Sequence, residues 1–235
     1  EKMHCSYEDG QPVLSGVNLC IGCNTTVGLV GSTGSGKTTL VDIILGLLDP
    51  KQGSITVDSI KINQDNSQSW QRKLGYVPQS IFLLDDTIKR NIAFSASGNQ
   101  INDERIIEVA KMANLHQYVT TLDEGYNSKV GERGVRLSGG QIQRIGIARA
   151  LYNNPEVLIL DEATSALDGV TENAVMDAIH NLSNKKTIIM IAHRLSTIKE
   201  CDVIYFLDKG KIVDSGSYNE LIKSNQKFKE MSNML

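Results

Sequence analysis

Residues 26–44 read TVGLVGSTGSGKTTLVDII and contain the strongest structural signal in the chain. The apolar stretch TVGLV leads into GSTGSGKT (31–38), which fits the pattern G-x-x-x-x-G-K-[ST] completely, and an apolar helix follows. A glycine-rich turn between a strand and a helix presents backbone N–H groups to phosphate oxygens. The stretch therefore predicts a nucleotide-phosphate site in an α/β fold. The alternative is an accidental glycine-rich turn, and the order of strand, loop and helix argues against it.

The residue types of this loop match the chemistry of a bound nucleotide. We expect the backbone amides to cradle the β-phosphate, Lys37 to reach the β- and γ-phosphate oxygens, and the Thr38 hydroxyl to ligate Mg²⁺. The predicted binding set is Gly31, Ser32, Thr33, Gly34, Ser35, Gly36, Lys37, Thr38 and Thr39.

The remainder of the chain alternates between strand-like and helix-like patterns. Strands are predicted within 1–30, at 54–62, at 73–79 up to a turn at Pro78, at 156–160, 187–192 and 202–207, and in a hairpin at 208–216. Helices are predicted at 102–115 with Asn102 as N-cap, at 139–152 and at 172–182. Continuous apolar strands separated by helices indicate a mostly parallel sheet covered on both faces.

The composition is that of an ordinary globular protein. The chain has 235 residues, 40% hydrophobic and 22% charged, with a net charge of -3, so nothing global indicates binding to nucleic acid or to an anionic membrane surface. No apolar run approaches the roughly 18 residues that span a bilayer, and no secretory signal opens the chain. Because the sequence starts without a Met and within an apparent strand, we expect a domain of a longer protein.

Four cysteines occur, and two of them, Cys20 and Cys23, form a CxxC that is predicted to lie on a strand running into a turn. No second Cys/His pair at metal-ligand spacing accompanies them. Together with Cys5 and Cys201, they are interpreted as reduced thiols of a cytosolic protein.

An acidic pair, Asp161 and Glu162, directly follows the predicted strand in VLILDEATSALD (157–168). Ligands of open α/β sheets bind at the carboxyl edge of the strands, so Asp161 is expected to hold Mg²⁺ and Glu162 to deprotonate the attacking water. The alternative is that the pair caps the next helix. GTPases read guanine with N-K-x-D, but NKKT (184–187) has Thr187 in place of the Asp and follows a helix, so ATP is the predicted nucleotide.

A second glycine-rich segment, LSGGQ (137–141), lies at the start of a predicted helix. A helix start of this kind can also bind an anion, yet the first loop already encloses the phosphates of its own nucleotide. Ser138 and the Gly139 and Gly140 amides are therefore predicted to contact the γ-phosphate held by a second copy of the chain. The alternative is an ordinary Ser N-cap followed by flexible glycines.

With these motifs the chain, from Tyr7 to beyond Gly216, resembles the nucleotide-binding domain of ATP-binding cassette (ABC) transporters. LSGGQ is that family's signature sequence, GSTGSGKT and VLILDE resemble its Walker A and B motifs, and YVPQ, SALD and IAHRLST resemble its Q-loop, D-loop and switch regions. The resemblance implies a P-loop NTPase core with a mostly parallel sheet and flanking helices, an N-terminal antiparallel β-subdomain, and an inserted helical signature subdomain. It assigns residues 1–79 and 156–235 to the core and 80–155 to the helical subdomain.

The resemblance also implies roles for single residues. Tyr7 would stack on adenine, Gln79 would ligate Mg²⁺ and sense the membrane partner, and Gln141 would belong to the signature contact. His193 would contact the γ-phosphate and act with Glu162 and Lys37 in catalysis, and Asp168 would lie at the dimer seam. The alternatives are a surface tyrosine, a strand-end glutamine, a buried core histidine and a helix-capping aspartate.

The segments KVGERGVRLSGGQ (129–141) and DDTIKRNIAF (85–94) resemble exporters, and the overall run resembles the branch that flips lipid-linked oligosaccharides and polysaccharide precursors. The resemblance implies a protein that hydrolyses ATP with Mg²⁺ as a head-to-tail dimer, most simply a homodimer. Its membrane domain would lie N-terminal to residue 1 and contact this domain through coupling helices, at the cytoplasmic face of the inner or plasma membrane. A non-transport ABC ATPase of DNA repair or translation is the alternative function, and a plain P-loop kinase or switch is a third.

The chain departs from the family pattern at several positions. Asn24 stands where glycine is usual, and Asn tolerates a left-handed backbone. Ile142 follows the signature where Arg or Lys is common, and Ser128 and Lys129 replace the Thr and Glu that are usual in exporters. These last changes bear on coupling to the membrane domain and not on ATP hydrolysis.

Overall fold

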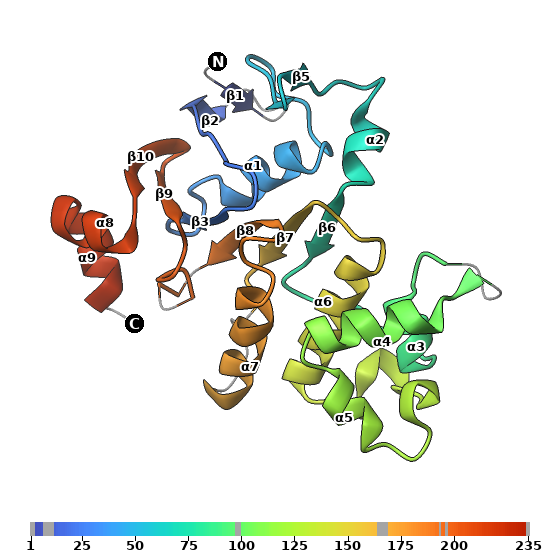
Figure 1. The fold of residues 1–235 in the computed structure, drawn as a ribbon. Helices are drawn as coiled ribbons and strands as arrows, with labels where there is room; N and C mark the ends of the chain where they lie inside the picture. The colour runs from blue at the N-terminus through green and yellow to red at the C-terminus, as the bar shows by residue number, and fades with distance from the viewer. Residues whose placement is uncertain are drawn as a thin grey trace. The chain divides into compact units, whose positions relative to one another are not determined.

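The computed structural model describes residues 3–6, 12–96, 100–163, 169–192, 194–195 and 197–233. Three predicted site residues, Tyr7, Asp168 and His193, lie outside the described residues. The chain divides into two compact units, the first formed by residues 1–74 and 187–235 and the second by residues 75–186. Figure 1 labels most helices and strands of both units.

A sheet in the order β10-β9-β3-β8 forms the core of the first unit. Its strands are β3 (Thr26–Val30), β8 (Thr187–Ala192), β9 (Val203–Asp208) and β10 (Lys211–Gly216). β3 runs parallel to both β8 and β9, while β10 pairs antiparallel with β9. Every residue of β3 and β8 is buried, as the continuous apolar patterns predicted for strands covered on both faces.

Two short antiparallel pairs complete the strands of this unit. β1 (Met3–Ser6) pairs with β2 (Pro12–Val17), and β4 (Thr56–Val57) pairs with β5 (Ile60–Lys61). The prediction of one strand over 54–62 is therefore wrong. Asp58 and Ser59 both have positive φ, 49° and 68°, which is the backbone of a tight two-residue hairpin turn.

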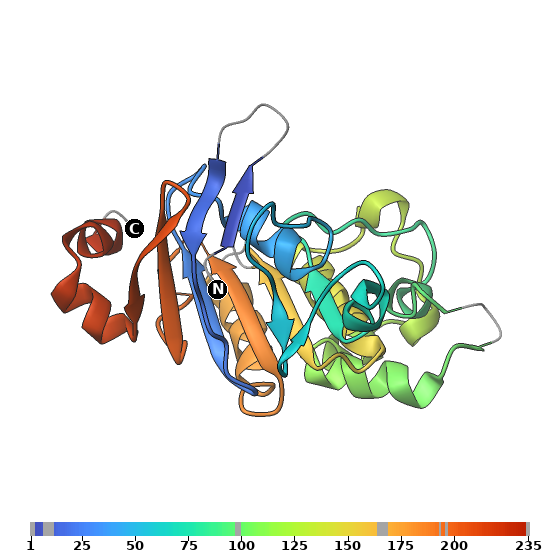
Figure 2. The same cartoon turned by 90° about the horizontal axis from the view of Figure 1, so that it is seen from above.

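The helices of the first unit are α1 (Lys37–Ile44), α2 (Ser67–Gln71), α8 (Tyr218–Ser224) and α9 (Gln226–Asn233). Figures 1 and 2 both show α8 and α9 beside β10 at the C-terminal end of the chain. The ring of Phe228 is fully buried there, edge-on to Phe206 of β9 and to Tyr218 of α8. This aromatic cluster fixes the two last helices to the sheet.

The second unit contains two neighbouring strands and a group of helices. The strands are β6 (Leu74–Val77, whose first residue belongs to the first unit) and β7 (Val157–Asp161). The helices are α3 (Ile88–Ile92), α4 (Asp103–Met112), α5 (His116–Thr120), α6 (Gly139–Tyr152), α7 (Gly169–His180) and the short 3₁₀ turns at Gly125–Asn127 and Glu132–Gly134. The predicted cap is confirmed, because the Asn102 side chain accepts a hydrogen bond from the Arg105 N–H of α4 at 3.0 Å.

Helix α6 is the central element of the helical group and contacts α3, α4 and α7. Gly146 of α6 lets the segment after Gln79 pass close to the helix, because a Cβ atom at that position would lie 2.2 Å from Cδ1 of Ile81. At the C-terminal end of α6, Arg105 of α4 donates to the carbonyl oxygens of Leu151 (2.6 Å) and Tyr152 (3.0 Å). A cation at this end satisfies carbonyls that have no partner within the helix. Within the described ranges, no helix combines the length and the apolar character that crossing a bilayer requires.

Candidate nucleotide-binding and hydrolysis site

The phosphate loop of the first unit has the backbone that its glycines predict. Gly34 and Gly36 have positive φ, 77° and 101°, and Gly36 is the N-cap of α1. Gly31 cannot be replaced without movement, because a Cβ atom there would lie 2.2 Å from the carbonyl oxygen of Leu207 and 2.7 Å from Oγ of Ser35. The loop is thus a narrow backbone turn that ends at a helix N-terminus, the geometry that binds anions.

The loop also carries a buried cation. Lys37 is only 6% exposed, and its Nζ donates to the carbonyl oxygens of Gly31 (2.7 Å) and Ser32 (3.1 Å). Close by, Oγ of Ser35 is buried and, in the described part of the chain, has no hydrogen-bond partner. An unsatisfied buried hydroxyl and a lysine amine directed into its own loop both fit a site shaped for phosphate oxygens.

The acidic pair of the second unit lies at the end of β7. Asp161 is the last residue of that strand, and Glu162 has a positive φ of 49°, a strained backbone for a residue other than glycine. The Nε2 of Gln79 donates to Oε2 of Glu162 at 2.6 Å, and the Tyr76 hydroxyl donates to Oδ2 of Asp161 at 3.2 Å. The predicted residues Gln79, Asp161 and Glu162 are therefore brought together, with Tyr76 added to them.

The predicted magnesium ligands have suitable chemistry. The carboxylate of Asp161, the amide oxygen of Gln79 and the hydroxyl of Thr38 are hard oxygen donors, which Mg²⁺ prefers. The hydrogen bond to Glu162 uses the Gln79 amide nitrogen and leaves the amide oxygen for a metal. Among the described residues no three His, Cys, Asp or Glu side chains gather as a metal cage.

The signature segment begins α6. Ser138 is the N-cap, its hydroxyl accepts from the Gln141 N–H at 3.3 Å, and Oε1 of Gln141 accepts from the Ser138 N–H at 2.8 Å. This capping box agrees with the helix-capping interpretation of Ser138. The Ser138 hydroxyl can still donate to a phosphate oxygen, because a serine hydroxyl that accepts one hydrogen bond keeps its own proton. Ser138 and Gly139 are exposed to solvent, whereas Gly140 is buried.

The segment before the signature packs against the residues that follow Gln79. The Ile88 N–H donates to the carbonyl of Ser128 (3.0 Å), and the Val130 N–H donates to that of Asp86 (3.1 Å). Lys129 therefore occupies a short β-bridge to Thr87. The departures Ser128 and Lys129 thus lie in a segment with regular backbone pairing.

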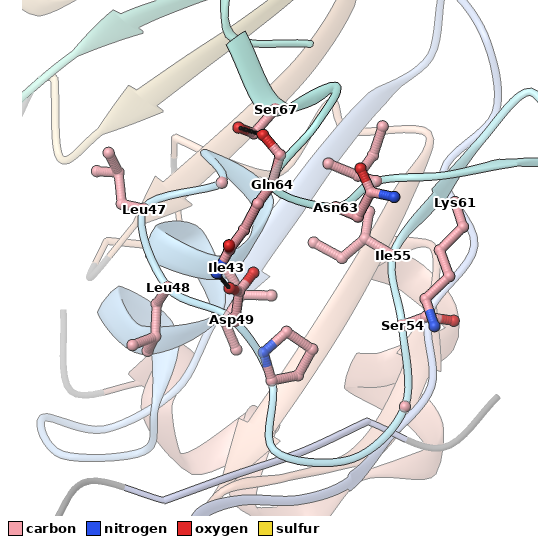
Figure 3. A pocket seen from close by; sticks show the side chains of 14 residues that line it. Ile43, Leu47, Leu48, Asp49, Ser54, Ile55, Lys61, Asn63, Gln64 and Ser67 are labelled. Carbon is pink, nitrogen blue, oxygen red and sulfur yellow. Dashed lines mark hydrogen bonds between the residues drawn. The ribbon is translucent and has the colours of Figure 1, made fainter.

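A separate hollow of about 280 Å³ lies in the first unit beside the end of α1 (Figure 3). Its lining mixes apolar and polar side chains, and Nε2 of Gln64 donates to Oδ2 of Asp49 at 3.4 Å. Leu47, which lines the hollow, leaves 68% of its surface exposed. This hollow lacks the glycine-rich backbone and the buried cation of the phosphate loop.

Comparison with known proteins gives a family match that covers the motifs described above. The family described as ABC transporter matches residues 14–165. The chain belongs to the ABC transporter family. The match covers the phosphate loop, Gln79, the signature and the acidic pair, so this ABC chain is an ATP-binding domain of the ATP-hydrolysing type.

Relatives with known names narrow the class of ABC protein. The chain is 45% identical to the heterocyst differentiation ATP-binding protein HepA of Nostoc sp., over 94% of this chain and 36% of that protein. It is 44% identical to the ATP-dependent lipid A-core flippase of Saccharophagus degradans, over 94% of this chain and 37% of that protein. A solved bacterial Atm1-family ABC exporter with ATP bound superposes with a TM-score of 0.89 at 36% identity, over 99% of this chain and 41% of that one.

These comparisons confirm the predicted α/β fold and the exporter-type ABC ATP-binding domain, and they do not favour a repair or translation ATPase. This ABC chain spans about a third of the length of the two named relatives. The sequence interpretation missed one side chain of the site, Tyr76, because a tyrosine on a strand carries no signal of a bond to a carboxylate some 80 residues away in the chain.

Proposed function

We propose that this chain is the ATP-hydrolysing domain that powers an ABC exporter, and that it works as a head-to-tail dimer enclosing two Mg-ATP. The observation that supports a dimer is the exposed N-terminus of α6, where Ser138 and Gly139 lie at the surface. The phosphate loop of one copy would hold the triphosphate, and this helix start of the other copy would contact the γ-phosphate. A helix N-terminus stabilises negative charge without a change of its own structure during the reaction.

In the proposed mechanism the chain mainly positions the reactants and stabilises charge, as is usual for phosphoryl transfer. Lys37 and the loop amides bind the β- and γ-phosphates. Thr38, Gln79 and Asp161 would hold Mg²⁺, which neutralises charge that develops on the phosphate oxygens. Glu162 would accept the proton of the attacking water, with its carboxylate oriented by the 2.6 Å hydrogen bond from Gln79.

Three further roles rest on the family resemblance and on residues outside the described ranges. We propose that Tyr7 stacks on adenine, a contact worth roughly 1–3 kcal/mol. His193 would contact the γ-phosphate and keep the attacking water in line, and Asp168 would lie at the seam between the two copies. Gln141 would support Ser138 through the capping box that it forms.

The membrane domain is the second proposed partner. Large apolar side chains remain exposed in the second unit, among them Phe82 (60%), Phe94 (52%) and Val135 (80%). Such residues mark surfaces that another protein covers. Phe82 and Phe94 lie in the segment after Gln79, and Val135 lies just before the signature. A partner bound there would therefore contact segments that adjoin both Gln79 and the signature. The ATP-binding domain would then lie at the cytoplasmic face of the membrane that holds this partner.

A lipid-linked saccharide is the proposed cargo class. The resemblance to flippases of lipid-linked oligosaccharides supports it, and so does the 44% identity to a protein named lipid A-core flippase. The cargo contacts would belong to membrane segments outside this chain, so a flipping assay with labelled lipid-linked saccharide in vesicles tests this part alone.

Glu162→Gln tests the hydrolysis proposal. The new amide is isosteric and can still accept from Gln79, so the fold and ATP binding should survive. The hydrolysis rate should fall by about 10²–10⁴-fold, the usual contribution of a positioned base. ATP should also drive the variant into a stable dimer, measured by light scattering. Hydrolysis at the parental rate would show that Glu162 is not the base.

A further inference from the structure

Tyr76 lies on β6 between two buried residues, Gly75 and Val77, and its own side chain is 38% exposed. Its hydroxyl donates to Oδ2 of Asp161 at 3.2 Å. Three residues further along the chain, Gln79 donates to Glu162, the neighbour of Asp161. Both carboxylates of the acidic pair are therefore hydrogen-bonded by side chains that come from β6 or directly follow it.

We propose that Tyr76 is a positioning residue for the magnesium-side carboxylate. Its hydroxyl occupies Oδ2 of Asp161 and fixes the rotation of the carboxylate, so that the other oxygen is kept for the ion or for a water bound to the ion. Carboxylates that serve metals are commonly oriented by such outer hydrogen bonds, and losing one weakens metal binding. The inference rests on the proposed role of Asp161 in holding Mg²⁺.

The hydroxyl is not needed to hold the strand in place. Gly75 fixes the backbone of β6, because a Cβ atom there would lie 2.8 Å from the carbonyl oxygen of Ala150 and 2.9 Å from Cγ of Pro155. Val77 is fully buried. Removing one oxygen atom from the partly exposed Tyr76 leaves these contacts intact, so Tyr76→Phe tests the hydroxyl without disturbing the strand.

The expected effect is moderate. An O–H···O distance of 3.2 Å is longer than the usual 2.5–3.0 Å, and the ring is partly exposed. A hydrogen bond of this kind corresponds to roughly a threefold to tenfold change in an equilibrium constant. We expect Tyr76→Phe to raise the Mg²⁺ concentration that half-saturates ATP binding by about that factor.

The experiment titrates Mg²⁺ into purified protein and follows the binding of a fluorescent, non-hydrolysable ATP analogue. In excess EDTA, Tyr76→Phe should bind the analogue as the parent does, because the phosphate loop is untouched. At saturating Mg²⁺ its ATP hydrolysis should return to near the parental rate. A merely structural defect would instead weaken binding with and without Mg²⁺. The matched control is Tyr152→Phe, which removes a hydroxyl of the same unit that accepts from the Asn102 N–H at 3.0 Å and should change nothing in the titration.

Asp161→Asn separates failure of this inference from failure of the proposed function. It should raise the half-saturating Mg²⁺ concentration strongly, and adding Tyr76→Phe to it should cause no further shift. If Asp161→Asn shifts the titration and Tyr76→Phe does not, Tyr76 has no positioning role while the magnesium role of Asp161 stands. If neither variant shifts it, the metal assignment and the inference are both wrong.

Discussion

Replacing Arg149 by methionine should loosen the segment that follows Gln79. Arg149 extends from α6, and its guanidinium donates to the carbonyl oxygen of Asn91 (2.8 Å), to the Asn91 side-chain oxygen (3.1 Å) and to the carbonyl oxygen of Phe82 (2.9 Å). It also lies 4.9 Å from the ring centre of Phe94. Partial burial of the guanidinium lowers the pKa of Arg149.

The magnitude follows from these contacts. The bond to Phe82 is exposed, so water replaces it at little cost, whereas the two bonds to the fully buried Asn91 are partly buried. Two charge-assisted bonds at about 1–1.5 kcal/mol each, with about 0.5–1 kcal/mol for the cation–π contact, give a loss of roughly 2.5–4 kcal/mol. Methionine keeps much of the apolar stem, so the packing of α6 should change little. Arg149→Lys keeps the charge but not the planar fork and should lose about half as much.

Hydrogen–deuterium exchange of the amides in 84–93 measures this loss locally, without an assumption of two-state unfolding. A loss of about 2.5–4 kcal/mol lowers their protection by about 60- to 700-fold. The exposed Arg136 of the same unit provides the control, because Arg136→Met should leave the protection of this segment unchanged. Protection in Arg149→Met within about threefold of the parental value would refute the reasoning.

Two more predictions concern the first unit. Gly31→Ala should lower the free energy of unfolding by about 2–3 kcal/mol and weaken ATP binding, because the new methyl group meets the Leu207 carbonyl and Ser35. Gly34→Ala places no atom within 4 Å of its new methyl group, so it should lower the free energy of unfolding by only about 1 kcal/mol, through its positive φ. Equal melting temperatures and ATP affinities of the two variants would contradict this. Burial raises the pKa of Cys201 from 9.0 to about 12, so iodoacetamide at pH 8 should label the exposed CxxC thiols and spare Cys201 in the folded protein. Above pH 9 the unfolded chain loses this proton first, so the free energy of unfolding should fall as pH rises from 9.0 toward about 12, whereas Cys201→Ser should flatten that decline.

Much of the fold could be predicted because the deciding signals are local. The strand at 187–192 and the helix at 139–152 have the predicted bounds. A continuous apolar run marks the strand, and a serine followed by two glycines marks the start of the helix. The expectation for Asn24 is also confirmed, with a φ of 54° that suits the residue replacing glycine. Local patterning was sufficient at these positions.

Elsewhere the deciding interactions were not local or not typical. The hairpin at 56–61 was missed because its turn is Asp-Ser, without the glycine that usually marks two left-handed residues. The CxxC was placed on a strand, but Cys20 follows β2 in an irregular segment anchored by Tyr205, whose hydroxyl donates to the Cys20 carbonyl at 2.5 Å. Tyr76 was missed because β6 and β7 are separated by the whole helical group, so no local pattern shows that they are neighbours.

The account depends on hydrolysis sites that are shared between two copies, and mixed dimers test this most directly. Lys37→Ala disables the phosphate loop of one copy, and Ser138→Arg blocks the signature of another, so each variant alone should be inactive. Mixed in equal amounts, they should recover about a quarter of the parental ATPase rate, because half of the dimers are mixed and each mixed dimer holds one intact site of two. No recovery in mixtures shown to contain mixed dimers would place the whole site within one chain and contradict the account.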